Sequence, residues 1–299
     1  MQDDLFPGFG SERIDCGGLH LHCRVGGEGP PVLLLHGYPQ THATWHRVAP
    51  ALARHFTCIV ADLPGYGDSD APAPDEDQIP YTKRAMGQAM ARLMQRLGFP
   101  RFSVLGHDRG ARVAYRLALD QPERIERLGI VEVIPTWDMW ARFDAAMALR
   151  TYHWTFLAQP APLPERMIGA DPVAYLDWTL ASWAGERTLE AFDRRTLAAY
   201  RRAFARPERI RAMCADYRAG AGLDRAHDEA DRAAGRRIRA PLHLIWASNG
   251  FPAATGDPLG IWRGWATDVT GTEIEAGHFG QEENPQAVLA ALAPFLSGS

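Results

Sequence analysis

Cysteine is scarce in this sequence, with four residues among 299. Cys16, Cys23, Cys58 and Cys214 are scattered, they form no C-x-x-C pair, and no cluster of histidine and cysteine has the spacing of a metal site. This pattern argues against a disulfide framework and indicates reduced thiols in a cytoplasmic protein. It implies no metal and no organic cofactor.

Long apolar runs are missing as well. No stretch approaches the roughly 18 apolar residues that a membrane-spanning helix needs. The N-terminus, MQDDLFPGFG, opens with two acids where a signal peptide has a basic region and an apolar core. We therefore expect neither a membrane span nor a secretion signal.

Charge of one sign does not dominate any part of the chain. The sequence has 32 basic and 36 acidic residues, a net charge of −4 and 46% apolar residues. These are the values of an ordinary globular protein, and they give no indication of a nucleic-acid partner or a membrane surface. The length allows one large domain of strands and helices with an insertion, or two domains.

The strongest local pattern is Gly106-His107-Asp108-Arg109-Gly110. An apolar run over residues 102–105 favours a strand before it, and apolar positions over 111–118 favour a helix after it. The pentapeptide resembles the strand-to-helix elbow of α/β-hydrolases, in which small flanking residues permit a sharp turn and the central side chain stands at the edge of the sheet. A chance turn in which Asp108 caps the next helix is the alternative.

The central residue of this elbow is Asp108 rather than serine. An aspartate is ionised at neutral pH and can attack a saturated carbon directly. The product is an ester on the enzyme, which a water activated by histidine must then hydrolyse. Asp108 therefore predicts displacement at carbon, either of a halide or in an epoxide.

Strands and helices alternate through most of the chain. We expect an edge strand over 19–25, core strands over 32–35, 56–61, 128–134 and 241–247, a short strand over 273–275, and helices over 81–97 and 284–296. Apolar strands separated by helices indicate a mostly parallel sheet covered by helices on both faces.

The alternation stops between the strands at 128–134 and 241–247, where the pattern becomes helical. We therefore predict two parts. An α/β-hydrolase core comprises residues 1–136 and 238–299, and a helical cap over the active site comprises residues 137–237.

Candidate catalytic groups follow the strands in the order nucleophile, acid, histidine. Asp108 sits at the elbow, Glu132 lies near the end of a core strand, and His278 lies in the loop after the last strand. Glu132 needs a partner unless it lies at an exposed strand end, because glutamate is rarely buried unpaired. The backbone amides of Tyr38 and Arg109 are candidates for an oxyanion hole.

Two arginines follow the nucleophile on one helix face. Arg109 and Arg112 are three residues apart at a helix N-terminus, where the helix dipole disfavours cations. Asp108 can supply part of the anionic partner that they need, and a substrate carboxylate held by the guanidinium groups would supply the rest. The alternative is that Arg112 points to solvent or pairs with an acid.

Six stretches carry a more specific resemblance: HGYPQTHATWHRVAP, ADLPGYGDSD, YTKRAM, GHDRGARVAYRLALD, TYHWTFLAQPAPLPE and CADYRAG. Over nearly its full length the sequence resembles the fluoroacetate dehalogenases of the α/β-hydrolase superfamily. The first two stretches are shared with many relatives, whereas the last three are much more selective.

The resemblance implies roles for individual residues. Asp108 would attack the carbon that bears the halogen, Arg109 and Arg112 would bind the carboxylate, and His278 would activate water. The halide would be held by His153, Trp154 and Tyr217, with Trp183 as a further part of the pocket wall. The implied substrate is a small haloacid, and the resemblance also implies a homodimer.

The sequence departs from the family pattern at three positions. Glu132 stands where the family has aspartate, and its extra methylene requires a shifted rotamer or weakens the triad. Gly280 replaces an apolar residue after the histidine, and Gly260 replaces an acid. We expect these changes to affect the level of activity more than the type of reaction.

Three other functions compete with haloacetate dehalogenation. A dehalogenase that prefers chloro or bromo acids would share the whole mechanism. An epoxide hydrolase would use Asp108 and His278 with Tyr152 and Tyr217 as acids, but the paired arginines would have no role with a neutral epoxide. A binding protein on the same fold would not need the Asp, Glu and His set.

Overall fold

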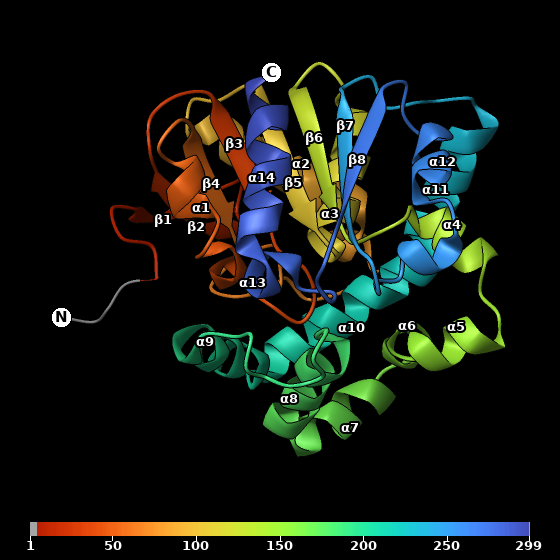
Figure 1. Ribbon diagram of the computed structural model, residues 1–299. Coiled ribbons are helices and arrows are strands. Elements are labelled where there is room, and N and C mark those ends of the chain that lie inside the picture. Colours follow the sequence, from red (N-terminus) through yellow and green to blue (C-terminus); the bar gives the residue numbers. More distant parts are fainter. Residues whose placement is uncertain (1–4, 299) are drawn as a thin grey trace.

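The computed structural model describes residues 5–298, and an eight-stranded sheet forms its centre (Figure 1). The strand order is β1-β2-β4-β3-β5-β6-β7-β8, with β1 and β2 antiparallel and the rest parallel. The strands are β1 (Gly10–Asp15), β2 (His20–Gly26), β3 (Pro31–Leu35), β4 (Thr57–Ala61), β5 (Phe102–His107), β6 (Ile125–Val131), β7 (Leu242–Ala247) and β8 (Val269–Ile274).

Helices cover both faces of this sheet, as the sequence predicts. Figure 1 shows α14 (Pro285–Ser297) and α1 (Ala49–Leu52) on the near face, with α2 (Lys83–Arg96) and α3 (Arg109–Asp120) behind. Apolar side chains form a separate buried cluster on each face: Leu292 of α14 belongs to one and Met90 of α2 to the other. Burial on both faces explains why the central strands are continuous apolar runs.

A set of helices is inserted between β6 and β7; most of them lie below the sheet in Figure 1, and the first and last lie beside it at the right. They are α4 (Thr136–Ala141), α5 (Ala145–Arg150), α6 (His153–Leu157), α7 (Leu163–Ala170), α8 (Pro172–Trp183), α9 (Arg194–Phe204), α10 (Pro207–Ala221) and α11 (Leu223–Ala233). The remaining elements are η1 (His42–Trp45), η2 (Ile79–Tyr81), η3 (Ala253–Thr255), α12 (Pro258–Arg263) and α13 (Gly280–Glu283). No helix in residues 5–298 is long and apolar enough to cross a membrane.

The strand predictions were wrong in three details. The last strand, expected as a short strand over 273–275, is β8 at Val269–Ile274 and begins four residues earlier. The strand expected at the edge, β2, pairs on both sides, because β1 lies outside it. Sequence patterning misses β1 because most of its residues are exposed and it has no apolar face. The strand expected over 128–134 also starts and ends earlier, at Ile125–Val131, so Glu132 follows the strand.

A buried aspartate stabilises the loops beside the site. Asp62, which follows β4, accepts hydrogen bonds from the amides of His42 and Asp68 at 2.8 and 3.0 Å. His22 Nδ1 and His42 Nδ1 each lie 2.9 Å from its Oδ2. These four contacts occupy both carboxylate oxygens, so hydrogen bonding accounts for the gathering of His22, His42 and Asp62, which has the composition of a metal site.

Candidate active site

Asp108 occupies a strained turn between β5 and α3. Its φ is 47°, in a region that non-glycine residues rarely adopt. The glycines around it are needed for close backbone approach: a Cβ on Gly110 would lie 2.3 Å from the carbonyl oxygen of His36, and one on Gly106 would lie 2.5 Å from Ala111 Cα. The turn therefore has the geometry of a nucleophile elbow, as the motif predicts.

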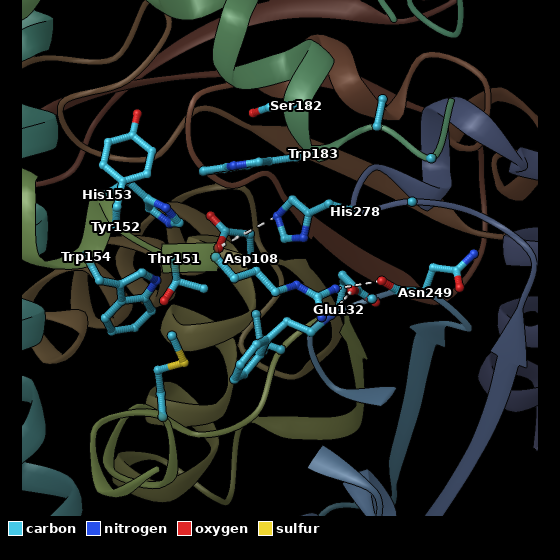
Figure 2. A pocket seen from close by; sticks show the side chains of 18 of the residues that line it. Asp108, Glu132, Thr151, Tyr152, His153, Trp154, Ser182, Trp183, Asn249 and His278 are labelled. Carbon is cyan, nitrogen blue, oxygen red and sulfur yellow. Dashed lines mark hydrogen bonds and ion pairs between the residues drawn. The ribbon is translucent and has the colours of Figure 1, made fainter. Parts of the chain in front are cut away.

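The two carboxylate oxygens of Asp108 have different surroundings. Oδ1 accepts a hydrogen bond from the amide of Tyr38 at 2.8 Å. Oδ2 lies 4.0 Å from His278 Nε2, the contact drawn as a dashed line in Figure 2. The Tyr38 amide that the sequence nominated for an oxyanion hole thus orients the Asp108 carboxylate in this structure, and Oδ2 faces His278.

Protonation states suit a nucleophile and a base. Burial would raise the pKa of Asp108, but His278 in its protonated form and the cationic neighbours Arg109 and Arg112 outweigh burial and hold the pKa below its ordinary value. Burial lowers the pKa of His278 to about 3. At neutral pH Asp108 is therefore ionised and His278 is neutral, so the imidazole can accept a proton from water.

Glu132 lies in the same cavity but does not bond to the histidine. Its Oε2 accepts from the amide of Ala247 at 2.7 Å and its Oε1 from the amide of Phe251 at 3.1 Å. Within residues 5–298, no hydrogen bond or ion pair joins Glu132 to His278. Burial raises the pKa of Glu132 to about 8, so it is mostly neutral at pH 7.

The structure separates the two arginines of α3. Arg109 is fully buried and engages Asp216 of α10: Nε lies 3.2 Å from both carboxylate oxygens, and Nη2 donates to the Asp216 carbonyl at 2.8 Å. Lys83 and Tyr66 bond to the same carboxylate. The partner of Arg109 is therefore an acid of the inserted helices, and only its Nη1 has no hydrogen-bond partner.

Arg112 does not point to solvent and has no acidic partner among the described residues. Its Nη1 donates to the carbonyl of Ile134 at 3.0 Å and to Thr136 Oγ1 at 3.1 Å. Its guanidinium lies over the ring of Trp154, 4.5 Å from the centroid, and the side chain lines the cavity. Burial lowers the pKa of Arg112, and an anion in the cavity would offset that cost.

Four aromatic side chains nominated from the sequence lie around Asp108, on α6, α8 and α10. The ring centroids of His153 and Tyr217 are 5.6 Å apart. The ring of Trp154 packs edge to face against Tyr217, with the centroids 5.8 Å apart. The ring of Trp183, at the end of α8, packs against that of His153, with the centroids 4.3 Å apart. Figure 2 shows His153, Trp154 and Trp183 around Asp108.

One cavity of about 760 Å³ unites most of these groups. Among the nominated residues it is lined by Asp108, Arg112, Glu132, His153, Trp154, Trp183 and His278, whereas Tyr38, Arg109 and Tyr217 are fully buried and do not line it. Sequence reasoning missed Arg150, whose Nη2 donates to the carbonyl of Asn249 at 2.6 Å across the cavity. Tyr152 was considered only as a possible acid, and it lines the cavity too.

Known proteins resemble this chain over nearly its full length. The family described as "alpha/beta hydrolase fold" matches residues 30–285. A fluoroacetate dehalogenase of Burkholderia sp is 38% identical over 98% of this chain and 95% of its own, and a soluble epoxide hydrolase of Corynebacterium sp. (strain C12) is 32% identical over 94% of each.

Solved structures agree with these sequence relatives. A structure of a proposed epoxide hydrolase of Pseudomonas aeruginosa, a single-residue mutant with bound MFA, is 46% identical with a TM-score of 0.94, and it covers 99% of this chain and 98% of its own. The sheet order, the elbow, the family match and these relatives lead to one conclusion. This chain belongs to the α/β-hydrolase family.

Proposed function

We propose that this hydrolase removes halide from haloacetates by hydrolysis, converting fluoroacetate and water into glycolate, fluoride and a proton. The observation that carries the proposal is a group of buried polar atoms without hydrogen-bond partners beside Asp108: Arg109 Nη1, Arg112 Nε, His153 Nδ1, Tyr217 Oη and His278 Nε2. Buried polar atoms left unpaired are costly, so these atoms indicate a polar ligand. The guanidinium of Arg112, which lines the cavity, favours an anion such as a carboxylate, and the buried Arg109 adds a second positive charge nearby.

The reaction has two steps. In the first, an Asp108 carboxylate oxygen attacks the carbon that bears the halogen, a carbon–oxygen bond forms, and the halide leaves with the bonding electrons. In the second, His278 accepts a proton from water and the resulting hydroxide attacks the carbonyl carbon of the ester. The tetrahedral intermediate breaks its bond to the glycolate oxygen, the proton of the added hydroxyl passes to that oxygen, and glycolate leaves. The Asp108 carboxylate is thereby restored, and His278 releases its proton to water.

The halide must be stabilised as it leaves, because fluoride is strongly hydrated. The Tyr217 hydroxyl and the Nδ1 atom of His153 have no hydrogen-bond partner. The ring of Tyr217 packs against the rings of both His153 and Trp154. Burial lowers the pKa of His153 to about 3, so its ring is neutral and carries one N–H at pH 7. A hydroxyl, an imidazole and an indole can replace part of the water shell of the halide.

Preference for chloro or bromo acids, and epoxide hydrolysis, are the alternatives. The Corynebacterium relative is named an epoxide hydrolase, and Tyr152 lines the cavity with its hydroxyl 3.5 Å from that of Tyr175. A neutral epoxide would leave Arg112 without an anionic partner in the cavity, which favours the haloacid.

The first test measures fluoride and glycolate release from fluoroacetate, with chloroacetate and a simple epoxide in parallel. Equal amounts of fluoride and glycolate support the defluorinating reaction. Chloride release without fluoride would favour the chloro and bromo preference, and diol formation alone would favour the epoxide hydrolase.

The mechanism is tested by trapping the ester. We expect Asp108→Asn to release no halide and His278→Ala to accumulate the ester, seen as a mass increase on the Asp108 peptide. Normal turnover by either variant contradicts the assigned roles. Arg112→Ala should raise KM for haloacetate strongly while leaving the midpoint of unfolding near that of the wild type.

The remaining proposals concern organisation. Residues 137–237 are proposed as a cap, consistent with the helices inserted between β6 and β7. Four free, buried cysteines are consistent with a cytoplasmic location. A homodimer is supported by exposed apolar side chains on the inserted helices: Leu149, Leu163, Met167 and Trp178 are 84%, 51%, 60% and 57% exposed. Light scattering on the purified protein tests the dimer.

A further inference from the structure

The loop that carries His278 is held through its main chain. Glu283, the last residue of α13, accepts hydrogen bonds from the amides on both sides of the histidine. Gly277 N donates to its Oε2 at 2.9 Å and Phe279 N to its Oε1 at 3.0 Å. Both carboxylate oxygens are therefore used to fix the peptide that bears His278.

The same carboxylate reaches the inserted helices. Glu283 Oε2 also accepts from the amide of Gly185 at 2.8 Å, just after α8. The contact is close: a Cβ on Gly277 would lie 2.2 Å from Gly185 N. In addition, the amide of His278 donates to the carbonyl of Trp183 at 3.0 Å. Glu283 thus joins the histidine loop to the segment that follows α8.

Side-chain rings complete the support of the histidine. The ring of Trp183 packs edge to face against His278, with the centroids 5.4 Å apart and an interplanar angle of 86°. It also stacks on Phe279, with the centroids 6.3 Å apart and an interplanar angle of 18°. On the opposite side, His107 Nε2 lies 2.8 Å from the His278 carbonyl oxygen. These contacts hold His278 without any bond to Glu132.

We propose that Glu283 is a positioning residue for ester hydrolysis. It fixes the His278 loop against the segment after α8, so that the imidazole is held where it can activate water at the Asp108 ester. This inference rests on the proposed function. The nucleophile is held separately, by its elbow and by the Tyr38 amide, so the halide-releasing step does not depend on Glu283.

Glutamine cannot replace Glu283 in this role. Three backbone N–H groups point at the carboxylate, whereas a carboxamide offers one acceptor oxygen and an NH₂ group that would face donors. Glu282→Gln is a matched control. Glu282 is fully buried, its carboxyl bonds to Tyr200 and Gln40, and burial raises its pKa to about 8, so glutamine resembles its neutral form.

The experiment separates the two steps in single turnovers of chloroacetate. Chloride and the mass of the Asp108 peptide are followed by rapid quench in the wild type, Glu283→Gln and Glu282→Gln. We expect Glu283→Gln to release about one chloride per site at nearly the wild-type rate and then to turn over about 10- to 100-fold more slowly, with the ester accumulating. Glu282→Gln should match the wild type.

Two results would overturn the proposal: unchanged turnover in Glu283→Gln, or equal losses in both steps, which a purely structural role predicts. His278→Ala run alongside tests the proposed function separately, because it should trap the ester whatever Glu283→Gln does. If the wild type releases no chloride, the proposed function fails. Amide hydrogen exchange at 183–186 and 276–280 then decides whether Glu283 holds the loop: faster exchange in Glu283→Gln supports it, and unchanged exchange refutes it.

Discussion

The titration of Glu132 should make the rate of ester hydrolysis depend on pH. With a pKa raised to about 8 by burial, it is neutral at pH 7 and becomes a carboxylate as the pH rises through that value. Its negative charge would then stabilise the imidazolium that His278 forms when it takes a proton from water. Below pH 8 this support is absent, and above pH 8 it is present.

We therefore expect the rate of ester hydrolysis to rise with pH with a midpoint near 8. Glu132→Gln should remove the rise, and Glu132→Asp, which restores the residue of the family pattern, should retain a titration. The measurement is kcat for chloroacetate between about pH 6 and pH 9.5. A midpoint near 8 that survives in Glu132→Gln would assign the titration to another group.

The placement of some residues in the site could be predicted from the sequence, and that of others could not. Asp108 and His278 are predictable because motif and strand order place them. The bonds of Glu132 are not, because they come from Ala247 and Phe251 in β7 and the loop after it, and because Glu132 itself adopts a φ of 61°. The contacts of Glu283 could not be predicted from sequence because its partners are three backbone amides, which every residue except proline has.

Asp216 is the shared acidic partner of two buried cations that lie on other helices. It lies on α10, in the inserted helices, and its carboxylate bonds to Arg109 of α3 and Lys83 of α2. All three side chains are almost fully buried, and the charges of Arg109 and Lys83 outweigh burial and hold the pKa of Asp216 well below its ordinary value. Removing the Asp216 carboxylate would leave the buried charges of Arg109 and Lys83 without this ion-pair partner.

We expect Asp216→Asn to lower the free energy of unfolding by roughly 3 kcal/mol or more. It should also raise KM for haloacetate more than it lowers kcat, because Arg109 loses the contact that orients it. Asp177→Asn is the control: Asp177 pairs with Arg201, which is 40% exposed, and such pairs contribute about 1 kcal/mol or less. Urea unfolding and steady-state kinetics check both effects, and equal stabilities for the two variants would contradict the argument.

Most elements of the core follow from the sequence because burial on both faces leaves an unmistakable apolar run. Helix ends in the insertion do not. The start of this helical segment forms three helices, α4, α5 and α6, because the chain turns at residues 142–144 and 151–152. Local propensity does not record such turns, which depend on packing against α10 and α11.

At the scale of the molecule, the active site lies where the inserted helices meet the carboxyl ends of the parallel strands. Two acids buried in this region, Glu132 and Glu282, have a pKa raised to about 8 by burial. In the unfolded chain each would titrate near 4.5. Between these values the native state retains protons on these two acids that the unfolded state has lost, so the two acids contribute less stability as the pH rises.

Buried neutral histidines such as His153 and His278, with a pKa of about 3 against 6.5 in the unfolded chain, make stability rise with pH up to about 6.5. Above that range only the two acids still titrate among these groups, so we expect the urea midpoint of unfolding to fall from about pH 7 to about pH 8 and then to level off. Glu282→Gln removes one of the two groups and should make the fall shallower, because glutamine does not titrate. Glu190→Gln, at an exposed glutamate, should leave the slope unchanged. A midpoint that rises from pH 7 to pH 8 would mean that these acids are ionised in the native state, and the neutral Glu132 on which the kinetic prediction depends would be wrong as well.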